Sequence, residues 1–131
     1  MRLYLDTAPV IYTVERVSPY FAAVNARVSV VGVVLITSDL TRMECRIKPL
    51  RQGDTTLLKD YDDYFREAVT ATVSLSSEIM ERAAEVRAKY GFKTPDAIHL
   101  GAAVVSGCEV FLTNDHRLDR FAELSVEVVQ R

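Results

Sequence analysis

The 131-residue sequence contains no tryptophan and only two cysteines, Cys45 and Cys108. Two cysteines do not make a disulfide framework, and neither has histidine or cysteine partners at the spacing of a metal site. Internal repeats, low-complexity tracts and linker-like stretches are also missing. The sequence therefore predicts one domain spanning residues 1–131, with both cysteines serving as small buried apolar residues.

Long hydrophobic runs are absent too. No apolar stretch approaches the roughly 18 residues that a membrane-spanning helix needs. The first residues lack the basic segment, apolar stretch and small-residue cleavage site of a signal peptide. We expect a cytoplasmic protein without a membrane partner.

The sequence also lacks an excess of positive charge. The chain has 16 basic and 18 acidic residues, for a formal net charge of −2. A protein that binds nucleic acid through a general electrostatic field is usually basic. Composition alone therefore argues against a nucleic-acid enzyme.

Strand-like and helix-like segments alternate along the chain. Apolar or β-branched runs predict strands at residues 1–5, 30–36, 72–75, 110–113 and 125–129. Six helices are expected: one from Thr7, one over 20–28, one from the cap cluster at 37–39 through Lys48, and three over 54–68, 76–90 and 94–106. Pro49 is expected to end the third helix, and Thr94 to cap the last. This alternation predicts an α/β fold, a three-layer α/β/α sandwich around a parallel sheet of four to five strands.

Four carboxylates fall near the carboxyl ends of these strands. Asp6 and Asp115 directly follow two predicted strands, Asp96 lies in the first turn of a helix, and Glu44 lies one to two turns into another. Ligands of open parallel sheets bind at this edge. Converging carboxylates repel one another unless a cation neutralises them, and oxygen ligands favour Mg²⁺ or Mn²⁺. One or two such ions could support in-line phosphodiester cleavage by water.

Each acid also has an ordinary structural interpretation. Asp96 would be stabilised by the dipole of the helix that it begins, Asp115 is typical of a turn, and Glu44 is typical of a solvated helix face. Asp6 is harder to explain structurally, because a charge that ends a buried strand is costly without a partner. The joint placement of the four residues carries the hypothesis.

Four segments, in order, resemble motifs of the PIN-domain ribonucleases, and among them the VapC-type toxins of toxin–antitoxin pairs. Leu3-Tyr4-Leu5-Asp6-Thr7 resembles the opening strand with its first acid. Ser38 to Glu44 resembles the family's Ser-x-x-Thr-x-x-Glu helix start. Thr94 to Ala103 resembles its Asp-Ala-x-x-x-Ala-Ala helix, and Phe111 to Asp115 resembles its Thr-x-Asp end.

This resemblance implies a metal-dependent endoribonuclease acting on RNA, usually homodimeric and inhibited by a cognate antitoxin. It implies an acidic quartet that binds Mg²⁺ or Mn²⁺, neighbours that hydrogen-bond to it, and a possible fifth acid. The quartet is Asp6, Glu44, Asp96 and Asp115, the hydrogen-bonding neighbours are Thr7, Thr113 and Asn114, and the fifth acid is Asp119. His99 and Gly101 replace small apolar residues of the family motif, which we interpret as packing variation.

RNA would also need cations near the acids. Arg42, Arg46 and Lys48 lie on the helix that carries Glu44, although a solvated helix face is their more ordinary explanation. The alternative function is a non-catalytic PIN-fold module that binds RNA or protein. A phosphatase that uses Asp6 as nucleophile is disfavoured, because the second Asp needed two residues later is missing.

Overall fold

The computed structural model describes residues 1–129 and contains one parallel sheet of five strands. The strands are β1 (Arg2–Leu5), β2 (Val34–Ser38), β3 (Ala71–Val73), β4 (Val110–Thr113) and β5 (Ser125–Val128). Their spatial order is β3-β2-β1-β4-β5, and every neighbouring pair is parallel. The predicted parallel sheet is confirmed, with β1 and β4 as adjacent central strands.

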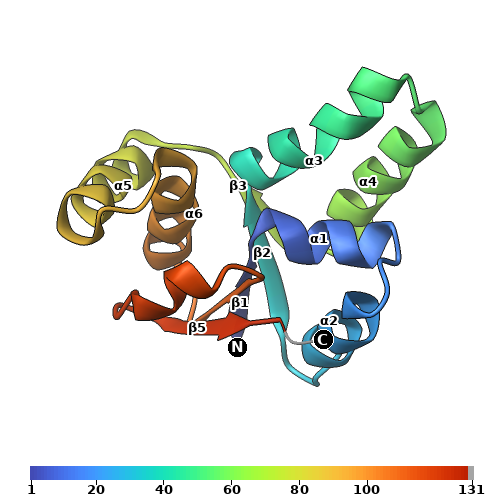
Figure 1. The fold of residues 1–131 in the computed structure, drawn as a ribbon. Coiled ribbons are helices and arrows are strands. Elements are labelled where there is room, and N and C mark those ends of the chain that lie inside the picture. Colours follow the sequence, from blue (N-terminus) through green and yellow to red (C-terminus); the bar gives the residue numbers. More distant parts are fainter. Residues whose placement is uncertain (130–131) are drawn as a thin grey trace.

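Helices cover both faces of this sheet (Figure 1), which confirms the three-layer sandwich. On one side lie α5 (Ser77–Tyr90) and α6 (Thr94–Val105). On the other side lie α1 (Thr7–Val14), α2 (Tyr20–Val28), α3 (Asp39–Gln52) and α4 (Thr55–Glu67), and a short 3₁₀ helix, η1 (His116–Arg120), follows β4. No helix among residues 1–129 is long and apolar enough to span a membrane.

Several element boundaries differ from the sequence-based prediction. β2 begins at Val34, not Val30, because residues 30–33 form a turn in which Val31 is 99% exposed. α3 continues past Pro49 to Gln52 and ends at Gly53, whose φ of 63° is left-handed. A proline removes only one backbone donor, and the buried Pro49 side chain offsets part of that cost.

Two helix caps also differ. The N-cap of α1 is Asp6, whose carboxylate accepts the Thr7 N–H, whereas the sequence predicts Thr7 as the cap. The N-cap of α6 is Lys93, which makes no side-chain capping bond, and Thr94 is the first helical residue. Asp6 is thus tied to the backbone at the strand–helix junction, and its position is fixed locally.

The strand β1 divides its side chains between the two layers. Leu3 and Leu5 pack into the core beneath α1 to α4, while Tyr4 packs under α6 beside Phe111. This is the two-residue alternation of a strand buried on both faces. Tyr4 consequently lies on the same side of the sheet as α6, which carries Asp96 and His99.

The helices α5 and α6 pack unusually close together at Gly101. A Cβ atom placed there would lie 2.9 Å from the Ala83 nitrogen and 3.2 Å from the Ile79 carbonyl oxygen. Both are backbone atoms, which cannot move aside as a flexible side chain can. The packing interpretation of Gly101 is therefore supported, and the contact fixes α6 against α5.

Candidate functional site

The four predicted acids line one hollow at the carboxyl end of the sheet, next to the ends of β1 and β4. The hollow has a volume of about 270 Å³. Its lining residues come from α1, α3, α6 and the turn after β4, and are Asp6, Thr7, Ala8, Ile11, Glu44, Pro95, Asp96, His99, Asn114 and Asp115. We call this site the acidic hollow. The geometry brings together all four residues that the sequence suggested.

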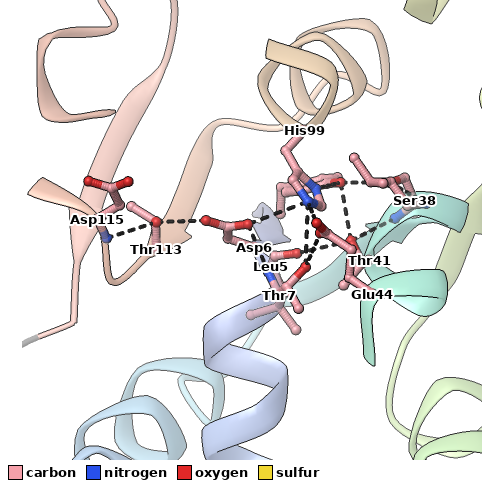
Figure 2. A network of polar contacts seen from close by, with 11 residues as sticks. Leu5, Asp6, Thr7, Ser38, Thr41, Glu44, His99, Thr113 and Asp115 are labelled. Carbon is pink, nitrogen blue, oxygen red and sulfur yellow. Dashed lines mark hydrogen bonds and ion pairs between the residues drawn. The ribbon is translucent and has the colours of Figure 1, made fainter. Parts of the chain in front are cut away.

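Thr113 links the two acids that follow neighbouring strands. Its hydroxyl donates to Asp6 Oδ2 at 2.7 Å and accepts the backbone N–H of Asp115 at 3.1 Å (Figure 2). The Asp6 Oδ1 atom accepts the Thr7 N–H at 2.8 Å. Both Asp6 oxygens are therefore oriented by hydrogen bonds, and the predicted supporting role of Thr113 matches its contacts.

Glu44 reaches the hollow from α3 and is held by two donors on the same oxygen. The Thr7 hydroxyl donates to Glu44 Oε1 at 2.6 Å, and His99 Nε2 lies 2.7 Å from that atom. Burial raises the pKa of the Glu44 carboxyl, but these two hydrogen bonds outweigh it, and the pKa lies below its ordinary value. Glu44 is accordingly an ionised and immobilised carboxylate.

His99 is the centre of a buried chain of polar groups. The imidazole is only 2% exposed, and its Nδ1 atom lies 2.7 Å from the Tyr4 hydroxyl. That hydroxyl also contacts the hydroxyls of Ser38 at 2.8 Å and Thr41 at 3.2 Å, at the start of α3. This series of hydrogen-bonded polar groups connects the sheet, α3 and α6 to Glu44.

Glu44 defines the direction of one of the two hydrogen bonds of His99. Because Glu44 is ionised, its Oε1 atom accepts, and His99 Nε2 must carry the proton. His99 Nδ1 shares a second hydrogen bond, 2.7 Å long, with the Tyr4 hydroxyl. Burial raises the pKa of Tyr4, so the phenol keeps its proton. His99 therefore acts as a rigid connector between Tyr4 and Glu44.

Asp96 is the one acid of the hollow whose side chain has no hydrogen bond or salt bridge within the described part of the chain. Burial raises the pKa of its carboxyl, and the charges of Asp6 and Asp115 raise it further. The half-buried Asp96 carboxylate is thus destabilised by two like charges in the same hollow. It occupies a position that a cation would stabilise.

The substitution Asp96→Asn should therefore stabilise the protein in metal-free buffer. Since the folded-state pKa is raised, the ionised carboxylate costs stability at neutral pH, and this cost disappears as the pH falls below 3.8, the ordinary pKa of an aspartate. We expect the melting temperature at pH 7 to rise by on the order of a few degrees. Circular dichroism melts across this pH range would test this, with the exposed Asp60→Asn on α4 as control. An equal melting temperature at pH 7 would contradict the electrostatic argument.

Asp115 is paired with a neighbouring arginine. Arg117 donates from its Nε and its terminal nitrogen to the two carboxylate oxygens, the shorter contact being 2.6 Å. These hydrogen bonds hold the pKa of Asp115 below its ordinary value. Within residues 1–129, no three His, Cys, Asp or Glu side chains stand close enough together to hold a metal ion. Two of the four acids are instead paired within the protein, Asp115 with Arg117 and Glu44 with His99.

Of the remaining predicted residues, only Asn114 lies at the acidic hollow. Asn114 lines the acidic hollow, but its amide donates to the Tyr12 hydroxyl at 2.9 Å. Asp119 is exposed on η1 and does not line the hollow. The predicted RNA contacts on α3 form ion pairs away from the hollow: Arg42 and Arg46 with Asp62, and Lys48 with Glu15.

Sequence reasoning overlooked the roles of three residues at this site. His99 was assigned to packing variation, although a histidine three residues after Asp96 occupies the same helix face. Tyr4 is the one side chain of β1 that combines burial with a polar tip. Arg117 stands two residues after Asp115, which is a local signal for an ion pair in a turn.

The fold and site together define an α/β protein with an acidic site at the carboxyl edge of a parallel sheet. The family model described as PIN domain matches residues 3–124. The chain therefore belongs to the PIN domain family, which confirms the resemblance of its motifs. No curated protein matches the chain significantly.

Solved structures show the same fold at low sequence identity. A chain of VapBC2 from Rickettsia felis, solved with a DNA fragment from the VapBC2 promoter, has a TM-score of 0.82 and 14% sequence identity. The match covers 99% of this chain and 100% of that chain. VapC20 from Mycobacterium tuberculosis, described as a Sarcin-Ricin loop cleaving toxin, has a TM-score of 0.72 and 13% identity, covering 94% and 98%. A chain of VapBC from Salmonella typhimurium, solved with DNA, has a TM-score of 0.72 and 16% identity, covering 98% of each chain.

Proposed function

We propose that this chain is a metal-dependent endoribonuclease that hydrolyses RNA phosphodiester bonds, and that it is the toxin of a type II toxin–antitoxin pair. The observation that carries the proposal is the gathering of Asp6, Glu44, Asp96 and Asp115 around one hollow in a PIN domain. Two structures of the same fold are described as a toxin–antitoxin complex and as a toxin, which supports the biological part of the proposal.

The residues of the acidic hollow fit a divalent cation chemically. All four acids offer oxygen donors, which suit Mg²⁺ or Mn²⁺. The pKa of Asp96, raised by burial and then by two neighbouring charges, indicates that the carboxylates are not fully compensated by the protein. Asp6, Asp96 and Asp115 would hold one or two ions, with Asp115 exchanging Arg117 for the metal.

The cation would supply charge stabilisation and an activated water for attack on phosphorus. The protein's own groups would do the positioning. Asp6 is oriented by Thr7 and Thr113, so its carboxylate presents a fixed geometry. Glu44 has one oxygen occupied by Thr7 and His99, which leaves its other oxygen to orient the attacking water.

Metal removal tests the catalytic proposal. The purified chain, free of any partner, should cleave single-stranded or hairpin RNA with Mg²⁺ or Mn²⁺, and EDTA in excess over the metal should abolish the cleavage. Gel electrophoresis of end-labelled RNA measures the result, and restored Mn²⁺ should restore the products. Cleavage that persists in EDTA would contradict metal dependence, and no cleavage of any RNA would favour the alternative below.

The alternative is a non-catalytic PIN-fold module that binds RNA or protein. One observation favours it: Glu44 and Asp115 are already engaged by His99 and Arg117 within the chain. In that case the chain would bind RNA or protein without cutting RNA at any metal concentration. The metal-removal experiment separates the two functions directly.

An antitoxin partner is consistent with an apolar stripe on α3. Met43, Ile47 and Leu50 are 51%, 43% and 59% exposed and recur at the spacing of one helix face. An amphipathic helix of a partner protein is a common occupant of such a face. The homodimer implied by the family stays a prediction, which light scattering of the purified chain would test.

A further inference from the structure

A second hollow of about 170 Å³ lies beside the acidic hollow, and Asp96 lines both. Its walls come from η1, the loop between α5 and α6, and the start of α6. The lining residues are Gly91, Phe92, Lys93, Asp96, Arg117, Leu118 and Arg120. Three of these seven residues are cations, so positive charge borders the acidic hollow in a protein whose net charge is −2.

Two of these cations are not neutralised by the protein. Among residues 1–129, the exposed Lys93 side chain makes no hydrogen bond or salt bridge. Arg120 has no carboxylate partner there either, and its guanidinium lies over the Phe92 ring, 4.2 Å from the ring centroid. Arg117 differs, because its Nε and one terminal nitrogen donate to Asp115, and a metal ion would have to displace it from there. Lys93 and Arg120 therefore have charge available for a ligand.

The cations on the opposite layer provide a contrast. Arg42 and Arg46 share Asp62, and Lys48 is paired with Glu15. Ion-paired side chains have to break these contacts before they can bind a phosphate. Among the described residues, Lys93 and Arg120 are accordingly cations without a carboxylate partner in a hollow that shares Asp96 with the acidic hollow.

The position of Lys93 and Arg120 beside the acidic hollow favours a particular ligand. Every nucleotide of an RNA strand carries a phosphate, so when one phosphate lies in the acidic hollow, the next one along the strand has to lie near its rim. The Phe92 face holds the Arg120 guanidinium in place, which reduces the entropy lost when it binds a phosphate. Phe92 itself is only 4% exposed and cannot serve as a platform for a base.

We propose that Lys93 and Arg120 form a subsite for a backbone phosphate of RNA next to the scissile phosphate. This inference rests on the proposed function and deepens it, since it assigns the contact with a polyanionic substrate to the α5–α6 loop and η1. The expected RNA contacts on α3 are not part of this subsite. Because the subsite binds phosphate and not a base edge, its contribution should not depend on RNA sequence.

The test measures RNA binding apart from cleavage. Fluorescence anisotropy with a labelled single-stranded RNA is recorded over a range of KCl concentrations in Mg²⁺ buffer, in chains that carry Asp6→Asn to prevent cutting. The variants are Lys93→Gln, Arg120→Gln and the double variant, and the matched controls are the exposed Lys59→Gln on α4 and Arg51→Gln on α3. Arg120→Lys retains the charge and should retain most of the binding.

The double variant should bind the RNA about tenfold more weakly, and its log–log salt slope should be shallower by about 0.7, the value for one single-strand phosphate contact. The controls should change neither quantity, and thermal melts should show that all variants are folded. Unchanged affinity and slope in the double variant would overturn the subsite. An equal loss of RNA affinity in the two controls would overturn it as well, because the effect would then come from the net charge of the protein and not from a particular site.

The outcomes separate the subsite from the proposed nuclease. If the wild-type chain cleaves RNA and the double variant behaves as the controls do, the subsite is wrong while the nuclease stands. If the chain binds RNA through Lys93 and Arg120 but never cuts it, the subsite stands and the nuclease is wrong. If the wild-type chain does not bind RNA at all, both are wrong.

Discussion

Replacing Asp6 by Asn is expected to lower kcat/KM for RNA cleavage by about 100-fold or more, because substitution of groups that merely support a metal ligand already costs roughly 10–100-fold. Asp6 lines the hollow at the junction of β1 and α1, and Thr113 links it to Asp115 through hydrogen bonds. The substitution removes one negative charge and replaces one carboxylate oxygen by an amide nitrogen that cannot bind a cation.

The fold should tolerate this change. The oxygen of the introduced amide would still accept the Thr7 N–H, and the Thr113 hydroxyl, which now donates to Asp6, can instead accept from the amide nitrogen. Loss of activity in Asp6→Asn would then reflect chemistry and not unfolding. Initial cleavage rates, Mn²⁺ binding measured by electron paramagnetic resonance and a thermal melt would be compared for each chain.

The matched control is Asp60→Asn, an exposed acid on α4 outside the acidic hollow. It changes the net charge by the same amount, so any general effect of charge on RNA binding appears in both variants. Wild-type cleavage by Asp6→Asn would contradict the proposed site. A loss of activity accompanied by unchanged Mn²⁺ affinity would place the metal elsewhere in the hollow.

Much of the architecture could be predicted because it follows from local patterns. Buried strands appear as continuous apolar runs, and helix ends are marked by residues such as Ser38 and Gly91, which the structure places as N-cap and left-handed C-cap. The acids at the ends of β1 and β4 then converge because parallel strands end at the same edge. These inferences need only the order of elements along the chain.

The rest depends on which elements become neighbours in space. The contact between His99 on α6 and Glu44 on α3 joins residues 55 positions apart, and the partner of Arg46 is Asp62 on a different helix. Neither pairing follows from residue type or spacing within one element. Prediction of α3 failed at Pro49 for a related reason, since burial of its side chain by tertiary packing offsets the missing donor.

The second large effect is expected at His99. Replacing His99 by Leu fills a similar volume but removes both the donor to Glu44 and the hydrogen-bond partner of Tyr4. Loss of an orienting partner of this kind costs roughly 10–100-fold in activity. The variant His99→Gln keeps one donor and one acceptor at the end of the side chain, so it should retain a substantial part of the activity. Equal losses in both variants at unchanged stability would contradict the connector role.

The way in which activity is lost would also show what Glu44 does. Its Oε1 atom already accepts from Thr7 and His99, so little of its negative charge is left on that oxygen for a cation. We therefore expect His99→Leu to lower kcat while Mn²⁺ affinity stays at the wild-type value, as for a carboxylate that orients water. A parallel fall in Mn²⁺ affinity would instead make Glu44 a direct ligand. Tyr4→Phe removes only the hydroxyl behind His99, and it should lower kcat in the same way but by less, because the imidazole still contacts Glu44.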